Sequence, residues 1–536
     1  MMQKTPHLRI VSVAMLAFLV AATAKSQIRQ VPMTSAPCTV AAGLDGTVVE
    51  ADSFLLDKAA YDMHVDEQGT EACLRFRSLT KKGKWGKQTW LRAVDLTTMT
   101  PRWEWPVEGT DYDIDMTRQG VMLTYADKVA MMQLSDGYTC WQKSLLPVYW
   151  NDSLDIVLGY TNITSNKVHA YRMSTGEELW TAKIAHETRW GWNDVMPVGD
   201  DHLLVVADGI CLISLTSGDL KKADAKTGVV DVKRAILQGL AAVGGAVVGT
   251  VISGGSYVPY VYGVSPNVIS GLTSNILFHD SLLYVSDRTR LRCFDLELNE
   301  QWSYEWPAKT ASAANLFVRD QQLCMVNYGF GIRSGSGLTK SGKPFIASFD
   351  LPTGTLHNFN QLSTKNNMIL GAVTTEDHAL LLFNDGMACQ HFEDSLVNIN
   401  TWDVGQYGKL YEFLPDTLYA YHDNDRAMRP LAFDGFSCPV YAYNDKTHQA
   451  SIFVIDEKLS IIDQFPYENT YRPLARHNGY LFVADQHGDA WVIHEFGLPV
   501  AHATRNDIKS VGMFNDYIYM LAQNALLRVE TDRLLR

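Results

Sequence analysis

One stretch of the chain, residues 168–184 (VHAYRMSTGEELWTAKI), constrains the fold more than any other. Its first half carries the apolar residues of a strand, it reverses at residues 174–176, and its second half carries Trp180. Gly176 provides the permissive backbone that a tight reversal needs. A two-stranded hairpin cannot bury a tryptophan by itself, so this pattern predicts a hairpin with further strands beside it.

The same order of strand, turn and strand recurs along the chain. Each copy has an apolar strand, a turn at an aspartate, a second apolar strand and a further turn, and the copies occupy residues 121–141, 203–220, 282–302 and 480–500. The turns near Leu134, Met173 and Leu215 are about 40 residues apart, the length of a four-stranded propeller blade. We therefore predict an all-β chain that forms a single β-propeller of four-stranded blades. Eight blades are favoured and seven to ten are compatible, and residues 47–54 are expected to supply an outer strand that closes the ring.

The turn sequences also resemble a known repeat. STGEELW, LSDGYTCW, DLTTMTPRW and DLELNEQW are similar to the repeat of the pyrroloquinoline-quinone-like (quinoprotein-like) β-propellers. In that family the glycine of the turn and the tryptophan after it dock one blade against the next. The resemblance implies this docking role for Gly176, Trp103, Trp141, Trp180 and Trp302. It is clear over residues 91–302 and fainter beyond, and it implies a fold alone, because the family includes both redox enzymes and non-catalytic envelope scaffolds.

The first 26 residues have the layout of a secretory signal peptide. Lys4 and Arg9 precede an uncharged run at 10–24, and small residues follow at a plausible cleavage site. A membrane anchor is the alternative, although about 15 apolar residues are few for crossing a bilayer. We expect an exported, periplasmic or outer-envelope protein, with a leader segment at 27–41 and the propeller at 42–536.

Composition argues against several partners and chemistries. The formal net charge of −13 is unsuited to nucleic acid, whose phosphates require clustered Lys and Arg. The eight cysteines are dispersed and Cys211, Cys293 and Cys389 lie inside apolar strands, which favours buried thiols over disulfides. The chain lacks the vicinal cysteines that quinone-dependent members of the family use, and its histidines form no metal-binding pair. We therefore expect no cofactor, no metal and no catalytic residue.

An apolar, glycine-rich insertion interrupts the repeat at 220–274. Its central run, 235–255, contains no charged residue, and small residues recur every four positions at Ala241, Gly245, Gly249 and Ser253, the spacing of close helix contacts. A helix of this length would cross a bilayer, whereas a glycine-rich loop folded over the propeller is the alternative. We expect the insertion to contact an envelope protein partner, or the membrane through 235–255.

Two other features are candidates for surface sites. Trp190 and Trp192 stand close together and would either stack on a sugar or peptide or pack between blades. A repeated Asp-Ser/Thr-Leu triplet resembles a short O-glycosylation acceptor of some bacterial envelopes, and it is also a natural turn sequence. Its hydroxyl residues are Ser153, Ser281, Ser395 and Thr417.

These features leave two classes of function. The lack of catalytic motifs favours an exported, non-catalytic propeller that acts as a protein-interaction scaffold in the cell envelope. The alternative is a quinone- or sugar-binding propeller, which includes an enzyme that uses its central channel.

Overall fold

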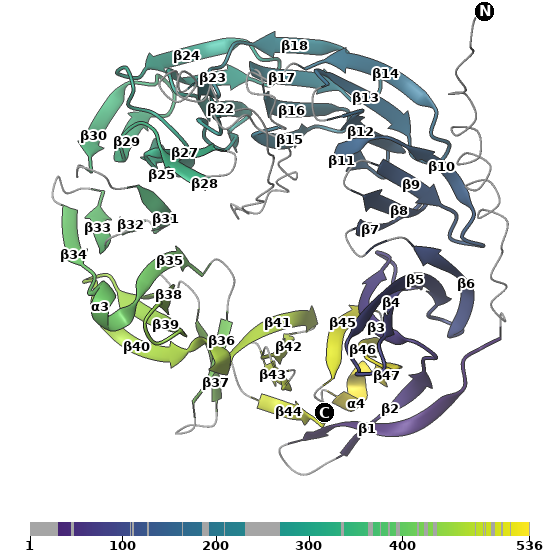
Figure 1. Cartoon of the computed structure of the whole chain (residues 1–536). Coiled ribbons are helices and arrows are strands. Elements are labelled where there is room, and N and C mark those ends of the chain that lie inside the picture. Colours follow the sequence, from purple (N-terminus) through teal and green to yellow (C-terminus); the bar gives the residue numbers. More distant parts are fainter. Residues whose placement is uncertain are drawn as a thin grey trace, which may run out of the picture.

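The computed structural model shows a ring of antiparallel β-sheets, with the chain running around the ring from sheet to sheet (Figure 1). It describes residues 31–43, 48–107, 109, 112–125, 128–162, 165–184, 192–207, 209–230, 268–333, 337–362, 368–375, 377–383, 386–392, 397–414, 418–422, 427–431, 437–477, 479–485, 487, 489–494, 499–504, 507–514 and 516–534.

The first four sheets of the ring are regular four-stranded units, each built from consecutive strands. They are β3 (Ala59–Val65), β4 (Glu71–Leu79), β5 (Trp85–Asp95) and β6 (Thr100–Val107); β7 (Tyr112–Thr117), β8 (Gly120–Tyr125), β9 (Lys128–Met132) and β10 (Thr139–Lys143); β11 (Leu146–Asn151), β12 (Ile156–Tyr160), β13 (Lys167–Arg172) and β14 (Glu178–Lys183); and β15 (Asp194–Val198), β16 (His202–Ala207), β17 (Gly209–Ser214) and β18 (Leu220–Ala223).

The next four sheets are also four-stranded, with a hairpin inserted in the second of them and another after the first strand of the fourth. They comprise β21 (Leu277–His279), β22 (Leu282–Ser286), β23 (Arg290–Asp295) and β24 (Glu300–Glu305); β25 (Ala314–Arg319), β26 (Gln322–Asn327), β29 (Phe345–Asp350) and β30 (Leu356–Gln361); β31 (Ile369–Thr374), β32 (His378–Phe383), β33 (Gly386–His391) and β34 (Val397–Thr401); and β35 (Lys409–Phe413), β38 (Ser437–Asn444), β39 (Gln449–Asp456) and β40 (Ile461–Pro466). The hairpins are β27 (Phe330–Arg333) with β28 (Gly337–Lys340), and β36 (Leu418–His422) with β37 (Ala427–Leu431).

The ring is closed by an N-terminal hairpin, β1 (Ser35–Gly43) and β2 (Val48–Leu55). Strand β2 pairs with β47 and completes the C-terminal sheet, while β1 pairs with β44 of the preceding sheet. This joins the last two units, and because β36 also pairs with β41, the hairpin β36–β37 belongs to the same 11-stranded sheet. The remaining strands are β41 (Thr470–His477), β42 (Tyr480–Ala484), β43 (Ala490–His494), β44 (Pro499–Ala503), β45 (Ile508–Phe514), β46 (Tyr517–Ala522) and β47 (Ala525–Glu530).

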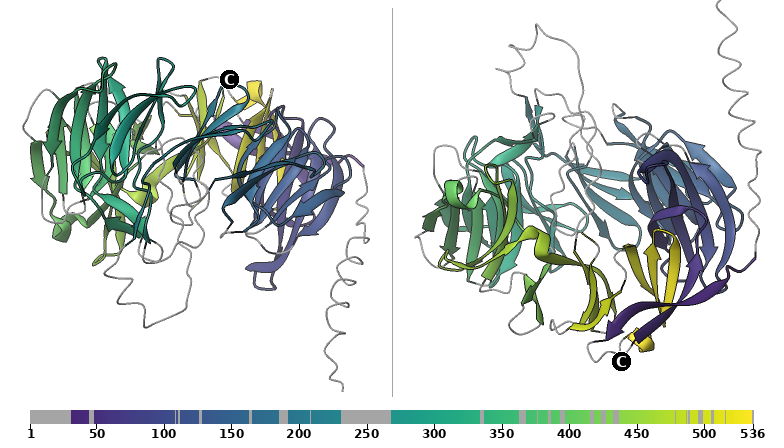
Figure 2. Two further views of the ribbon diagram at one scale, coloured as in Figure 1. Left: turned by 90° about the horizontal axis from the view of Figure 1, so that it is seen from above. Right: turned by 60° about the horizontal axis from the view of Figure 1, so that its bottom comes forward.

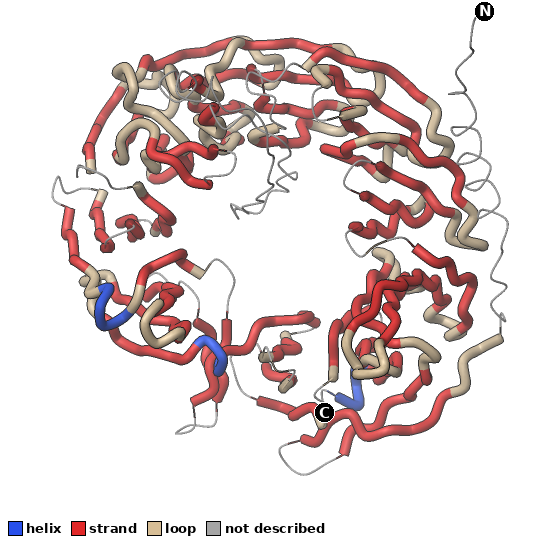
Figure 3. The backbone as a smooth tube through the Cα atoms, in the orientation of Figure 1, coloured by secondary structure: helices blue, strands red, loops and turns tan. Residues whose placement is uncertain are grey.

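Strands account for nearly all regular structure in the described residues, which confirms the predicted all-β propeller (Figure 3). Helix is confined there to three short pieces, α3 (Val404–Tyr407), the 3-10 turn η1 (Tyr467–Asn469) and α4 (Thr531–Leu534). Within the described ranges, no helix has the length and apolar character needed to cross a membrane. Two further views show that the ring is not flat (Figure 2).

The number of blades lies at the upper limit of the expected range, and two strands extend across the expected domain boundaries. The described strands form eight separate four-stranded sheets and two more four-stranded units inside the 11-stranded sheet. The ring therefore has ten units among the described residues, within the seven to ten that were compatible and above the favoured eight. Strand β1 lies mostly within the expected leader (27–41), and β18 lies within the expected insertion (220–274), because both pair with neighbouring strands of the ring.

The apolar core consists of layers between neighbouring sheets. Strand β16 is buried on both faces: Leu203 and Val205 pack toward the preceding sheet, and Leu204 and Val206 pack toward the following one. Alternate residues of a strand point to opposite faces, so a strand between two neighbours needs a continuous apolar run. This explains why the inner strands of the repeat have such runs in the sequence.

The ends of the insertion are held together on the ring. Short strands β19 (Val229–Val230) and β20 (Val268–Ile269) pair with each other, and the backbone N–H of Leu272 donates to the carbonyl of Thr227 at 2.9 Å. Asp287, in the next sheet, accepts a hydrogen bond from the backbone N–H of Lys226 at 3.1 Å. The residues between these anchors, 231–267, include Ala241, Gly245, Gly249 and Ser253 and lie outside the described residues.

Candidate functional site

Four tryptophans occupy one common position in the ring. Each lies on the outermost strand of its sheet, and its indole N–H donates to a backbone carbonyl of the next sheet. The donor–acceptor pairs are Trp103 Nε1 to Leu134 O (2.8 Å), Trp141 Nε1 to Met173 O (2.6 Å), Trp180 Nε1 to Leu215 O (2.7 Å) and Trp302 Nε1 to Leu351 O (3.2 Å).

Each of these indoles also lies against a turn glycine of the next sheet. Gly176 has a φ of +72°, and a Cβ placed there would lie 2.5 Å from Cγ of Trp141. The glycine therefore serves two purposes, since it adopts a left-handed conformation and leaves room for the ring. The other pairs are Gly137 with Trp103, Gly218 with Trp180 and Gly354 with Trp302. Gly176 thus receives the indole of the preceding sheet and not Trp180 of its own hairpin.

Strand register identifies the same position in sheets that have no tryptophan there. Trp180 pairs with Ala170, next to a β-bulge, and the corresponding pair in the sheet of β29 and β30 is Asn358 with Ser348, also next to a bulge. In the sheet of β17 and β18 the position is held by Lys221, whose Nζ donates to Oδ1 of Asn299 in the next sheet at 2.8 Å. The four tryptophans and Lys221 therefore make a side-chain contact with the next sheet from this position.

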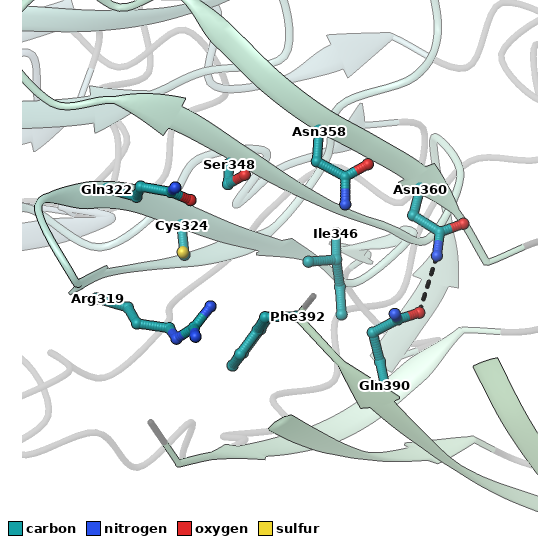
Figure 4. Close-up of a pocket in the computed structure, with 9 residues that line it drawn as sticks. All are labelled: Arg319, Gln322, Cys324, Ile346, Ser348, Asn358, Asn360, Gln390 and Phe392. Carbon is teal, nitrogen blue, oxygen red and sulfur yellow. Dashed lines mark hydrogen bonds between the residues drawn. The ribbon is translucent and has the colours of Figure 1, made fainter. Parts of the chain in front are cut away.

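A pocket opens where Asn358 occupies this position. Figure 4 shows it between the sheet of β25, β26, β29 and β30 and the end of β33 in the following sheet. It is a small recess with room for about one water molecule, because most of the space around it is open solvent. Polar and apolar groups share its wall about equally, and the residues that line it are Arg319, Gln322, Cys324, Ile346, Ser348, Asn358, Asn360, Gln390 and Phe392.

The walls of the pocket are linked to each other. Nδ2 of Asn360 donates to Oε1 of Gln390 at 2.8 Å across the two sheets (Figure 4). The guanidinium of Arg319 lies 5.1 Å from the centre of the Phe392 ring, a cation–π arrangement. Burial raises the pKa of the Cys324 thiol to about 11, so this thiol stays protonated and unreactive at neutral pH. The pocket therefore offers hydrogen-bonding amides and a flat aromatic wall.

Sequence reasoning missed this pocket, although a signal was present. Asn358 follows Gly354 at the same interval at which Trp180 follows Gly176. A repeat alignment built on the turn glycine would have shown that an amide replaces the docking tryptophan there.

A row of tyrosines forms a second exposed feature, on β35, β38 and the 3-10 turn η1 that follows β40. Ring centres lie 6.0 Å apart between Tyr411 and Tyr441 and 5.4 Å apart between Tyr441 and Tyr467. Tyr411 is 46% exposed and Tyr467 is 39% exposed. Strand β40 of the same sheet exposes Ile461 and Ile462 as well. We refer to Tyr411, Tyr441 and Tyr467 as the tyrosine row.

A titratable cluster lies on β3, the neighbouring strand β4 and the strand β7 of the next sheet. Asp62 accepts hydrogen bonds from Arg75 (3.1 Å) and contacts Nε2 of His64 (3.0 Å). Burial raises the pKa of Asp62, but the hydrogen bond with His64 and the charges of His64 and Arg75 outweigh it and lower the pKa below its usual value. Burial, and next the charge of Asp113, raise the pKa of Asp115. Two carboxyl groups of one cluster are thus shifted in opposite directions.

The other expected site residues fall in the core, in turns or outside the described residues. Trp192 is 2% exposed and donates from Nε1 to the hydroxyl of Tyr160 at 2.8 Å, so it packs between sheets and has no face for a ligand. Ser153 and Ser281 lie exposed in turns, and Asp280 and Ser281 both have positive φ, as the tight turn of a hairpin requires. Trp190, Ser395 and Thr417 lie outside the described residues.

All eight cysteines are free thiols. In the described part of the chain, no group of three or more His, Cys, Asp or Glu side chains is arranged to hold a metal ion.

Comparisons with known proteins return structures of low similarity. No protein-family model and no curated protein sequence matches the chain. Among solved structures, BamB from Moraxella catarrhalis is 12% identical over 78% of this chain and 96% of its own, with a TM-score of 0.28. The Neurospora crassa Pan2 WD40 domain is 10% identical over 74% and 88%, with a TM-score of 0.27. Dihydro-heme d1 dehydrogenase NirN, in complex with DHE, is 10% identical over 71% and 72%, with a TM-score of 0.35. The assignment as a β-propeller therefore rests on the sheets of this structure.

Proposed function

We propose that this chain is an exported, non-catalytic β-propeller with pyrroloquinoline-quinone-like repeats that acts as a protein-interaction scaffold in the cell envelope. The observation that carries the proposal is the tyrosine row. Exposed aromatic side chains that contact one another on a rigid sheet are typical of surfaces that bind proteins, because each buries a large area at a small entropic cost.

The proposal that the chain is exported to the cell envelope rests on its sequence and not on the structure of the ring. The signal-peptide pattern at 1–26 supports export, and an exported scaffold has envelope proteins as its natural partners. The insertion is proposed as a second contact, with a protein partner or with the membrane through 235–255.

The test compares two exposed aromatic positions in the full-length chain. Tyr411→Ser combined with Tyr467→Ser removes the row, and Tyr138→Ser removes a 62% exposed tyrosine in the turn before β10. Crosslinked envelope extracts are purified through a tag and the partners are quantified by mass spectrometry. We expect about a tenfold or greater loss of specific partners for the double variant and none for the control. Equal recovery with both variants would contradict the proposal, provided that both melt like the parent.

The titratable cluster of Asp62, His64, Arg75 and Asp115 supports a second candidate, a propeller that binds a quinone or sugar at its innermost strands. Two carboxyl groups with opposite pKa shifts beside a histidine are the kind of arrangement found in acid–base sites. Calorimetry with pyrroloquinoline quinone and with glucose oligomers tests it. Saturable binding that His64→Gln abolishes would favour this candidate over the scaffold.

A further inference from the structure

The hairpin of β4 and β5 extends beyond the other strands of its sheet (Figure 2). Strand β4 pairs with β3 only as far as Arg77, and β5 pairs with β6 only as far as Thr89. Past these residues Leu79 pairs with Trp85 across the hairpin, and no other described strand pairs with residues 78–88. Because a strand rises about 3.3 Å per residue, the tip stands roughly 10 Å clear of the sheet.

Hydrogen bonds within the tip hold it in one conformation. The backbone N–H of Thr80 donates to the carbonyl of Lys84 at 2.7 Å, and that of Gly83 donates to the carbonyl of Thr80 at 2.9 Å. Nε of Arg77 donates to the carbonyl of Gly86 at 2.6 Å. An ordered tip loses less conformational entropy on binding than an unstructured loop of the same sequence would lose.

The tip gathers positive charge on a chain whose formal net charge is −13. No Asp or Glu occurs between Glu71 and Asp95, and the tip carries four exposed lysines, Lys81, Lys82, Lys84 and Lys87. Among the described residues, none of these four ammonium groups has a carboxylate partner, whereas Lys58 bonds the carboxylate of Glu104 at 2.8 Å. The four charges are therefore available to an external anionic surface.

Two apolar side chains share the tip with the lysines. Trp85 is 40% exposed and Leu79 is 42% exposed, and they lie opposite each other in the hairpin. The ring of Trp85 also lies edge-on to that of Tyr61, with 5.9 Å between ring centres, which steadies the indole. A tryptophan beside lysines suits the boundary of a bilayer, because the indole enters the boundary while the ammonium groups stay with the phosphates.

We propose that this tip, residues 79–87, docks on the surface of a bilayer that contains anionic lipids. The lysines lie against the lipid phosphates, and Trp85 and Leu79 enter the interface, whose depth of about 5–10 Å matches the height of the tip. Protein interfaces are depleted in lysine, so a protein partner fits the tip less well. RNA or DNA would neutralise the lysines but would offer Leu79 no apolar phase.

The test is fluorine NMR of the full-length chain labelled with 5-fluorotryptophan. The resonance of Trp85 is identified by its absence from Trp85→Phe. Vesicles of phosphatidylglycerol and phosphatidylcholine with nitroxide-labelled headgroups should broaden this resonance, and vesicles of labelled phosphatidylcholine alone should broaden it far less. Trp141, which is buried between sheets, should not broaden with either. The measurement reports contact of the tip itself, whichever other segment also reaches the vesicle.

A pair of charge variants gives the dependence on lysine. Lys81→Gln with Lys82→Gln should raise the lipid concentration for half-maximal broadening roughly 25-fold, about fivefold per lysine. Lys446→Gln with Lys458→Gln is the matched control, because it removes the same charge from two exposed turns of another sheet, and it should behave as the parent does. Both pairs should melt like the parent.

A Trp85 resonance that anionic vesicles do not broaden, or equal broadening in the parent and both charge variants, would overturn the proposal. Lysine-dependent binding of single-stranded RNA or polyglutamate without broadening by vesicles would overturn it as well. This contact goes beyond the scaffold role and does not depend on it. Tyr411→Ser with Tyr467→Ser should bind vesicles as the parent does, and Lys81→Gln with Lys82→Gln should recover the same protein partners, so the failure of one function leaves the other standing.

Discussion

At the scale of single residues, the indole contacts account for how neighbouring sheets are held in place. Trp141 is buried and donates to Met173 at 2.6 Å, whereas Trp180 makes the same bond from a partly exposed position. We expect Trp141→Ala to lower the free energy of unfolding by about 3–5 kcal/mol, the range for emptying a buried aromatic site, and Trp180→Ala to lower it less. Trp141→Phe keeps an aromatic ring and loses the hydrogen bond. Its free energy of unfolding from urea titrations therefore gives the contribution of the hydrogen bond apart from that of packing. Equal losses at Trp141 and Trp180 would contradict this ranking.

Alanine substitutions at Gly176 and Gly83 separate the stability cost of a strained backbone from the cost of a steric contact with the indole. Gly176→Ala places a Cβ against Trp141 at a φ of +72°, while Gly83→Ala has nearly the same φ, +73°, with no atom within 4 Å. Gly83→Ala should cost about 1–2 kcal/mol of stability for the left-handed backbone alone. Gly176→Ala should cost clearly more, since the indole must move as well. Thermal denaturation of the two variants gives the difference, and identical melting temperatures would show that the indole contact is not tight.

Asp115 gives a pH-dependent prediction. Its pKa is raised in the folded state, so the stability that its neutral form provides is present below the unfolded value of about 3.9 and is lost as pH rises through the folded pKa. Asp115→Asn should therefore melt at a higher temperature than the parent at pH 7, with the difference shrinking toward pH 3.5. A lower melting temperature for Asp115→Asn at pH 7 would mean that its charge is needed in the fold.

At the scale of elements, the insertion is expected to be separable from the ring. Val230 pairs with Val268, so the two ends of 231–267 are already adjacent on the chain's surface. Replacing 231–267 with an Asn-Gly turn should leave the melting temperature within a few degrees of the parent, because the anchors at Thr227, Leu272 and Asp287 remain. Circular dichroism and thermal melting check the fold. If the variant unfolds, the segment contributes to the core and its proposed contact role is lost.

Most of the fold was predictable, because the turn glycine and the following tryptophan repeat at blade length. The closing strand expected at 47–54 is β2 (Val48–Leu55), one residue away. The number of units was harder to predict, since the later turns lack the tryptophan and the hairpin β36–β37 separates β35 from its partner β38. The pocket was not predicted, because an asparagine in a strand looks ordinary until its register is known. For Trp192 the sequence allowed either a stacking surface or packing between blades, and its hydrogen bond to Tyr160 in the core agrees with packing.

At the scale of the whole molecule, the hairpin β1–β2 is expected to hold the last two units together. Deleting residues 31–55 exposes the edges of β44 and β47. Hydrogen exchange should then show lost protection at 499–503 and 525–530 and retained protection in the distant sheet β15–β18. A synthetic peptide of residues 31–55 added in trans should restore the protection. Unchanged exchange at both edges would mean that the ring does not depend on this closure.

The closure of the ring also determines when the first strands can pair during synthesis of the chain. The hydroxyl of Thr504 bonds the carbonyl of Thr39 across 465 residues of chain, and Arg528 reaches Asp52 across 476. At synthesis rates of about 5–20 residues per second, the first strands to emerge wait roughly 20–90 s for their partners. During that interval two strand edges and their apolar faces have no permanent neighbour. The ring can therefore close only after residues 499–530 have been synthesised, because β44 and β47 supply the partners of β1 and β2.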